Sequence, residues 1–309
     1  MIYTVTLNPA LDKTVEVKSL RVDQVNRVSA LRVDAGGKGI NVSKVIAKLG
    51  GESKALTILG GNTGKAISSA LDSAGIPCLT FNVAGETRTN LKVVDPELKT
   101  NTDINEPGPV VDPATLDSAL WSLSSIIDPG DIVVLSGSLP KGAPEATYAT
   151  WTAVCQKHGA RVLLDADGEA FKLGLEGKPY LVKPNIDELE RLVGHSLPDQ
   201  QSVIAAARDL IQNGVQRVVV SMGGDGALFI TESEAIRAHS PKVKVSSTVG
   251  AGDSVVASLA FALATHMSTE DTIVLAMATG AANVMSEGTQ AAEISVIDSL
   301  KDQVTFETA

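Results

Sequence analysis

The sequence is short of the features that mark secreted, membrane-spanning and metal-binding proteins. Among 309 residues there are 2 cysteines, Cys78 and Cys155, with no CxxC pair and no histidine at a spacing typical of zinc sites. No apolar run reaches the roughly 18 residues of a membrane span, and residues 1–9 lack the basic start of a signal peptide. These absences predict a cytoplasmic protein with reduced cysteines and no membrane contact.

Positive charge and aromatic side chains are also scarce. The chain has 26 Lys and Arg against 36 Asp and Glu, and its net charge of −10 disfavours nucleic acid as a partner. Aromatic residues make up 3% of a chain that is 44% hydrophobic, so the core is expected to be aliphatic. The 4 histidines are scattered, and no Ser/His/Asp or Cys/His relay can be assembled from them.

Short β-branched runs alternate with helical patterns along the chain. This alternation predicts a single doubly wound, three-layer α/β domain over residues 1–309 with a mostly parallel sheet. Strands are predicted at 3–7, 55–59, 131–135, 161–165, 180–182 and 217–221. Helices are predicted around 42–49, 116–127, 144–158, 200–213, 253–266 and 269–285.

Two segments interrupt this rhythm, at about residues 13–34 and 87–106. Both alternate at period two without a helix between them, which predicts antiparallel strands inserted into the α/β order. We expect them to pair into a small sheet, here called the lid, that covers a site. In doubly wound sheets, ligands bind beyond the carboxyl ends of the strands.

The most informative motif is Thr248-Val249-Gly250-Ala251-Gly252-Asp253-Ser254, between a predicted strand at 242–247 and a predicted helix. Glycines there let backbone N–H groups approach a ligand, and the helix N-terminus favours an anion. A carboxylate at Asp253 could take a proton from a hydroxyl while the N–H groups stabilise a transferred phosphoryl group. The alternative is a glycine turn in which Asp253 caps the helix.

A second glycine-rich segment, residues 36–41, also leads into a helix. It lacks the spacing of a Walker A loop, but Lys38 could reach a phosphate and Asn41 could bind sugar hydroxyls. Asp12 follows the first strand and suits hydrogen bonding to a polyol, whereas Arg88 suits a phosphate. The alternatives are a flexible turn with a solvated lysine, an Asx turn and a solvated arginine.

Two further loops carry candidate nucleotide ligands. Asn185 and Glu188 lie three residues apart at a helix start, where they could position hydrated Mg²⁺ or form a capping box. Residues 221–226 (SMGGDG) link two strands and could bind a nucleotide or form a plain hairpin.

Together these segments resemble the ribokinase-like, pfkB-type carbohydrate kinases over nearly the whole chain. The two signatures of that family correspond to residues 35–41 and 246–254, its NxxE element to residues 185–188, and a recurrent loop to residues 136–140. The resemblance implies a ribokinase-like α/β fold with a small β-sheet lid, and MgATP as phosphoryl donor. It also implies a homodimer formed through the lid, and some relatives bind K⁺ near the region of Ser247 and Val249.

By position, the resemblance implies roles for individual residues. Asp253 would be the catalytic base, and the amides of Gly250, Ala251 and Gly252 would form an anion hole. Asn185 and Glu188 would organise Mg²⁺ and phosphates through water. The acceptor sugar would be held by Asp12, Gly37, Asn41 and Arg88, with Lys38, Arg88 and Arg27 as candidates for its existing phosphate. ATP would be contacted by Lys183, Asn185, Glu188, Ser221, Gly223, Gly226, Thr248 and Asn283.

Within the family, several segments resemble the phosphosugar kinases, among them residues 1–12, Lys38, Arg88 and residues 105–109. This likeness implies transfer of a phosphoryl group from ATP to the 6-hydroxyl of D-fructose 1-phosphate. The first alternative is the 1-hydroxyl of tagatose 6-phosphate. Fructose 6-phosphate ranks lower, because enzymes acting on it usually have glycine at the position of Lys38 and a basic residue near that of Asp103. A non-catalytic sugar-phosphate sensor is also disfavoured, since Asp253 and its glycines are present, and a plain nucleoside or ribose kinase would leave Lys38 and Arg88 without an anion.

Overall fold

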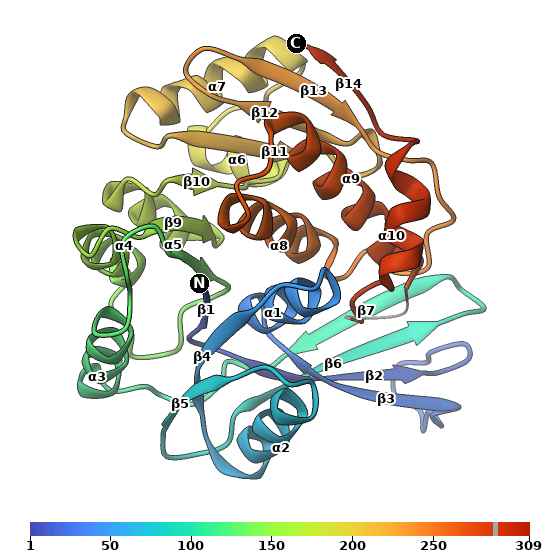
Figure 1. The fold of residues 1–309 in the computed structure, drawn as a ribbon. Helices are drawn as coiled ribbons and strands as arrows, with labels where there is room; N and C mark the ends of the chain where they lie inside the picture. Colours follow the sequence, from blue (N-terminus) through green and yellow to red (C-terminus); the bar gives the residue numbers. More distant parts are fainter. Residues whose placement is uncertain (287–289) are drawn as a thin grey trace.

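The computed structural model describes residues 1–286 and 290–309 and has a central sheet between two layers of helices (Figure 1). The strands are β1 (Ile2–Thr6), β4 (Ser53–Leu59), β5 (Cys78–Asn82), β8 (Ile132–Ser136), β9 (Arg161–Asp165), β10 (Leu181–Val182), β11 (Arg217–Ser221), β12 (Ala227–Ile230), β13 (Ala235–His239) and β14 (Thr305–Thr308). Their spatial order is β14-β13-β12-β11-β10-β9-β8-β1-β4-β5. The pairs from β11 to β5 are parallel, and the pairs from β11 to β14 are antiparallel.

Helices cover both faces of this sheet (Figure 1). One face packs against α3 (Pro113–Ser124), α4 (Thr147–Lys157), α5 (Gly168–Gly174), α6 (Ile186–Val193) and α7 (Gln200–Gln212). The other packs against α1 (Lys38–Lys48), α2 (Gly61–Ser73), α8 (Ala251–Ala264), α9 (Thr269–Met285) and α10 (Ile294–Lys301). No described helix combines the length and apolarity needed to cross a membrane.

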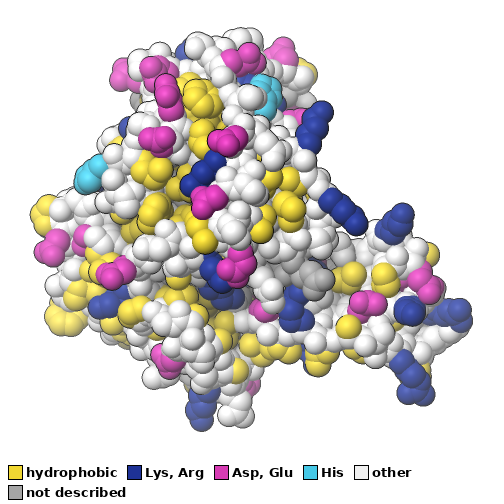
Figure 2. Space-filling model, turned by 45° about the vertical axis from the view of Figure 1, so that its right-hand side comes forward, with side chains coloured by type: hydrophobic (Ala, Val, Ile, Leu, Met, Phe, Trp, Pro, Cys, Tyr) yellow, Lys and Arg dark blue, Asp and Glu magenta, His cyan; other side chains and the backbone are white. Residues whose placement is uncertain are grey.

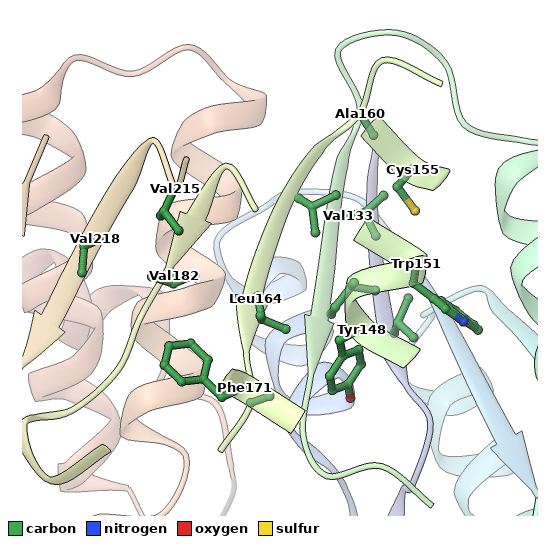
Figure 3. Close-up of a cluster of buried hydrophobic side chains, with 14 of the residues drawn as sticks. Val133, Tyr148, Trp151, Cys155, Ala160, Leu164, Phe171, Val182, Val215 and Val218 are labelled. Atoms are coloured by element: carbon green, nitrogen blue, oxygen red, sulfur yellow. The ribbon is translucent and has the colours of Figure 1, made fainter. Parts of the chain in front are cut away.

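Alternate residues of the central strands enter the hydrophobic clusters on opposite faces of the sheet. In β8, Val133 and Leu135 join the cluster under α3 to α7, whereas Ile132 and Val134 join the cluster under α1 and α8. A strand buried on both faces reads as a continuous apolar run, as the sequence of β8 does. The buried aromatic residues lie on one side, where Tyr148 and Trp151 of α4 and Phe171 of α5 pack against the sheet (Figure 3).

The lid is a separate four-stranded sheet of the order β3-β2-β6-β7. Its strands are β2 (Ala10–Glu16), β3 (Ala30–Gly36), β6 (Arg88–Asp95) and β7 (Thr100–Asn105). The predicted antiparallel pairing holds for β2 with β3 and for β6 with β7, but it is wrong for the central pair, because β2 and β6 run parallel. Both strands leave the same edge of the main sheet, β2 after β1 and β6 after β5, and therefore point the same way.

The structure also differs from the predicted elements at one predicted strand and at several elements that were not predicted. Residues 242–247 were predicted to form a strand, but they form none, and the amides of Ser246 and Ser247 donate to the carbonyl of Val284 instead. The helices α2, α5 and α10 and the strands β5, β13 and β14 had no predicted counterpart.

The strand order changes direction between β1 and β8. From β1 the chain builds outward through β4 to β5, and it then returns to β8 and builds the other way. The carboxyl ends of β1, β8, β9, β10 and β11 meet at one edge beside this switch point, where doubly wound proteins bind ligands. Residues that follow these strands therefore form the candidate site.

Candidate active site

Helix α8 begins in a glycine turn that presents free backbone N–H groups. Gly250 is its N-cap, with a φ of 79° that glycine adopts without strain. The amide of Ala251 makes only a long bond of 3.4 Å to the carbonyl of Thr248, and within the described residues those of Gly252 and Asp253 have no carbonyl partner. These amides and the helix dipole form a site suited to an anion. Because Asp253 is the third residue of the helix, the N-cap alternative for it is wrong.

Asp253 is buried beside this turn and contacts α1. Its side chain is 8% exposed, and Oδ2 accepts a hydrogen bond of 2.8 Å from Nδ2 of Asn41. Burial, with a smaller contribution from the charge of Asp165, raises the pKa of Asp253 to about 6. The carboxyl group is therefore mostly ionised at neutral pH and is a stronger base than an ordinary aspartate.

A second carboxylate, Asp165, lies at the end of β9 between two lysines. Its Oδ1 is 3.4 Å from Nζ of Lys38 and 3.5 Å from Nζ of Lys183, while its buried Oδ2 has no hydrogen-bond partner among the described residues. Burial alone would raise the pKa of Asp165, but the two ammonium groups hold it below its usual value. Sequence reasoning missed this residue, although a carboxylate ending the buried strand 161–165 was a usable signal.

The two lysines approach the glycine turn from different elements. Lys183 follows β10 and is 6% exposed, and a Cβ placed on Gly252 would lie only 3.2 Å from its Nζ. Lys38 begins α1, and the charges of Asp165 and Asp253 raise the pKa of its ammonium group despite burial. Both side chains therefore bring fixed positive charge to the anion site, close to the carboxylate of Asp253.

These groups line a cavity of about 630 Å³, large enough for a nucleotide. Its polar walls come from the loops after β9, β10 and β11, and its apolar wall comes from α9 and the segment 240–245. Of the residues predicted to contact ATP, the cavity is lined by Lys183, Asn185, Glu188, Ser221, Gly223, Gly226 and Thr248. Asn283 is not on this wall, because it is 2% exposed and its Nδ2 donates to the carbonyl of Val249 at 3.0 Å.

Asn185 and Glu188 form the capping box that was the alternative to a metal role. Oδ1 of Asn185 accepts from the amide of Glu188 at 2.8 Å, and Oε2 of Glu188 accepts from the amide of Asn185 at 2.9 Å. Both side chains nevertheless line the cavity, and the box leaves Oε1 of Glu188 unused. The hairpin alternative for residues 221–226 is also correct, since they join β11 to β12 while lining the same cavity.

A smaller cavity of about 240 Å³ lies under the lid, lined by Asp12, Asp34, Asn90, Lys92, Asp103 and other polar residues. Asp12 accepts a hydrogen bond of 3.0 Å from Nδ2 of Asn90, and burial raises the pKa of Asp12. Lys92 pairs with Asp103 at 3.4 Å. Excess carboxylates make this cavity suited to the hydroxyl groups of a sugar rather than to a phosphate.

Arg88 occupies the junction between this cavity and the main sheet. Its Nη2 donates to the carbonyl of Asn8 at 3.1 Å and lies 3.5 Å from Oγ of Ser138, while its buried Nε has no partner. Nδ2 of Asn8 also donates to Ser138, at 3.2 Å. The arginine is thus held in place with unused donor capacity, as a phosphate-binding residue would be.

The remaining predicted acceptor residues are only partly brought together. Gly37 caps α1 with a φ of 116°, and a Cβ there would lie 2.6 Å from Cγ2 of Thr6. Arg27 lies in the exposed loop between β2 and β3, at the end of the hairpin opposite Asp12. Four strand residues separate Asp12 from the loop, roughly 13 Å of strand. Within one chain, Arg27 is therefore remote from the other predicted residues.

Comparisons with known proteins agree with this geometry. A model for pfkB family carbohydrate kinases matches residues 5–295. The chain is 44% identical over 264 residues to 1-phosphofructokinase of Xanthomonas campestris pv. campestris, covering 84% of this chain and 83% of that protein. It is 39% identical to 1-phosphofructokinase of Bacillus subtilis over 93% of both. The structure of phosphofructokinase-2 from Escherichia coli in complex with potassium matches with a TM-score of 0.93 and 34% identity over 98% of each chain. That protein has also been solved with fructose-6-phosphate and in a tetrameric inhibited form.

Proposed function

The chain belongs to the pfkB family of carbohydrate kinases, and we propose that it transfers the γ-phosphoryl group of ATP to the 6-hydroxyl of D-fructose 1-phosphate. The products are fructose 1,6-bisphosphate and ADP. The observation that carries the catalytic assignment is the placement of Asp253 beside the free amides of its own helix. One buried base and one anion site thus meet between a nucleotide-sized cavity and a polar cavity under the lid.

We assign the chemical step to Asp253. Its carboxylate accepts the proton of the 6-hydroxyl as that oxygen attacks the γ-phosphorus, and the bond between that phosphorus and the bridging oxygen of ADP breaks. The amides of Gly252 and Asp253 and the ammonium groups of Lys183 and Lys38 face the charge that spreads over the transferred group. The hydrogen bond from Asn41 fixes the orientation of the carboxylate.

The donor set of the ATP cavity fits a hydrated magnesium ion. Oδ2 of Asp165 is buried without a partner and Oε1 of Glu188 is not used by the capping box, while Asn185 lines the same wall. No group of three or more His, Cys, Asp or Glu within the described residues forms a dedicated metal cage. This matches Mg²⁺, which keeps several waters and binds mainly through substrate phosphates. Bound there, it would neutralise charge on the phosphates of ATP.

Acceptor identity follows from the curated relatives together with the lid cavity. The curated relatives at 44% and 39% identity are both 1-phosphofructokinases, whereas the Escherichia coli phosphofructokinase-2 is 34% identical. In the lid cavity the charge of Lys92 is already paired with Asp103, which leaves the phosphate to Arg88 and Ser138. Lys38 faces Asp165 rather than the lid cavity, and its contact with the acceptor's own phosphate stays a prediction.

The direct test is ADP release with MgATP and each of three acceptors: fructose 1-phosphate, tagatose 6-phosphate and fructose 6-phosphate. We expect kcat/KM to be highest for fructose 1-phosphate. A preference for tagatose 6-phosphate would leave the chemical step intact and overturn the acceptor. No ADP release with any of the three would favour the non-catalytic sensor.

We further propose a homodimer through the outer face of the lid. Along the lid strands the face turned to the site is polar, whereas the opposite face exposes Leu31, Val33 and Ile104, which are 57%, 48% and 56% exposed. Figure 2 shows hydrophobic side chains beside Lys and Arg on this projecting lobe. Replacing Val33 with Glu should shift the mass measured by light scattering from dimer to monomer, whereas the exposed Leu98→Glu change beyond β6 should not. A wild-type monomer would contradict the proposal.

Potassium is proposed as an activating ion near Ser247 and Val249. The support is the potassium complex of the Escherichia coli relative and the fixed geometry of this loop, where Oγ of Ser247 accepts from the amide of Val249 at 3.3 Å. Turnover in KCl should exceed that in tetramethylammonium chloride of equal ionic strength. Equal rates in the two salts would refute this part of the proposal.

A further inference from the structure

Another cavity, separate from the ATP cavity and from the cavity under the lid, lies at the opposite edge of the central sheet, where β9, β10 and β11 begin. It encloses about 770 Å³, more than the 630 Å³ of the ATP cavity. A smaller hollow of about 270 Å³ adjoins it, since Tyr180, Arg217 and Thr272 line both. None of the residues assigned to phosphoryl transfer lines either space, so this edge forms a site of its own.

Two arginines converge on one tyrosine ring in the wall of this site. The guanidinium carbons of Arg161 and Arg217 lie 5.7 and 5.6 Å from the centre of the Tyr180 ring. Neither arginine forms an ion pair with any residue in the described part of the chain. Both side chains are partly buried. A bound anion would supply the counter-charge that they lack.

The remaining walls of the two spaces indicate the chemical character of the rest of the ligand. Thr269 and Thr272 stand at the start of the 17-residue helix α9, and His266 closes the smaller hollow. The larger cavity continues over the apolar side chains of Phe229 and Ile236. Its carboxylates, those of Glu232 and Glu234, are exposed on the turn between β12 and β13. The arginine end is therefore cationic and the rest is mostly apolar.

We propose that this cavity and the adjoining hollow bind a small organic phosphate. Its phosphate group accepts hydrogen bonds from the forked donors of Arg217, which lines both spaces, and Arg161 adds positive charge from the wall of the hollow. The planar or apolar body of the ligand covers Phe229 and Ile236. The ring of Tyr180, already stacked with both guanidinium groups, holds the two donors in a fixed orientation.

This site has a direct structural connection to the catalytic one. The strand β9 begins at Arg161 and ends at Asp165, and β11 begins at Arg217 and ends at Ser221 in the wall of the ATP cavity. Between them, Tyr180 and Lys183 flank the short strand β10. A five-residue strand spans only about 13 Å. The same three adjacent strands therefore carry residues of both sites.

The test is titration of the full-length protein with phenyl phosphate by isothermal calorimetry. Phenyl phosphate has the proposed anionic group and planar body. Arg161→Gln and Arg217→Gln should each weaken its binding about 10- to 100-fold, the effect of losing a hydrogen bond to a charged group. The matched control is Arg208→Gln, an exposed arginine on α7 outside both cavities, which should bind as the wild type does. Arg217→Lys keeps the charge and should bind more tightly than Arg217→Gln, which separates charge from loss of folding.

A Lys183→Gln variant distinguishes this site from the ATP cavity. Binding that survives Lys183→Gln and is lost in the Arg161 and Arg217 variants supports the proposal. Binding lost only in Lys183→Gln would place phenyl phosphate in the ATP cavity and overturn it. The absence of any heat from the wild-type protein up to 10 mM phenyl phosphate, on the order of the weakest affinity of interest, would overturn it as well.

Discussion

Asn41 Nδ2 donates a hydrogen bond of 2.8 Å to Oδ2 of Asp253, joining two glycine-rich segments that lie 212 residues apart in the chain. Each segment starts a helix, α1 in one case and α8 in the other. The contact commits one carboxylate oxygen to Asn41 and leaves Oδ1 available for a substrate hydroxyl. The orientation of the base is therefore set by the packing of α1 against α8.

Replacing Asp253 with Asn should remove general-base catalysis while preserving shape. We expect turnover to fall by about 10²–10⁴. The affinity for ATP should change little, because the amides and lysines that face the phosphates remain. Turnover is measured as ADP release and nucleotide affinity by calorimetry. An Asp253→Asn enzyme with near-wild-type turnover would contradict the assignment.

The pH profile should reveal the protonation of Asp253. Since the pKa of this carboxyl is about 6, kcat should fall as pH drops below about 6. The hydrogen bond from Asn41 lowers that pKa, so Asn41→Ala should move the acidic limb of the profile to higher pH. Asn62→Ala, on the distant helix α2, serves as the control. An unmoved limb in Asn41→Ala would argue against Asp253 as the titrating group.

The burial that raises the pKa of Asp253 should also make its ionised form destabilise the folded protein. Its folded pKa is raised, so its ionisation destabilises the native state as pH rises from about 4 through about 6. Asp253→Asn should therefore be more stable than the wild type by about 2–3 kcal/mol at pH 8. The difference should shrink toward zero near pH 4. Urea unfolding at the two pH values measures it, and equal stability of both proteins at pH 8 would refute the prediction.

Asp165→Asn should remove the negative charge that Lys38 and Lys183 share. Lys38 and Lys183 would then repel each other in a buried site, and kcat should fall by at least about tenfold. The charge of Asp165 also raises the pKa of Asp253, so the acidic limb of the pH profile should move to lower pH. A variant that only unfolds would not show that shift. Asp117→Asn, an exposed carboxylate on α3, is the control.

Arg88 should act on the acceptor alone. Arg88→Ala removes the guanidinium group beside Ser138 that we assign to the phosphate of the acceptor, so KM for fructose 1-phosphate should rise about 10- to 100-fold. KM for ATP should stay within about twofold of the wild-type value, because Arg88 does not line the ATP cavity. Equal rises in both constants would indicate a general structural defect instead.

Local patterns were sufficient for much of the fold. The strands 161–165 and 217–221 were predicted with their observed ends, because buried parallel strands read as continuous apolar runs. Helix α2 was missed, since its sequence is rich in glycine and serine and it owes its stability to packing of Ile67 and Leu71 against β4. The pairing direction of β2 with β6 could not be read, because period-two alternation is the same in either direction.

The site shows the same division. The glycines, Asp253, Lys183 and the Asn185–Glu188 element are local motifs, and local patterns were enough to predict that they end strands or begin helices at one edge of a sheet. Three relationships appeared only in the folded chain: Asp165 lies between Lys38 and Lys183, Asn283 supports the loop at Val249, and Arg27 lies away from Asp12. Charge pairing and burial depend on distances between elements far apart in the chain, and no local pattern encodes those distances.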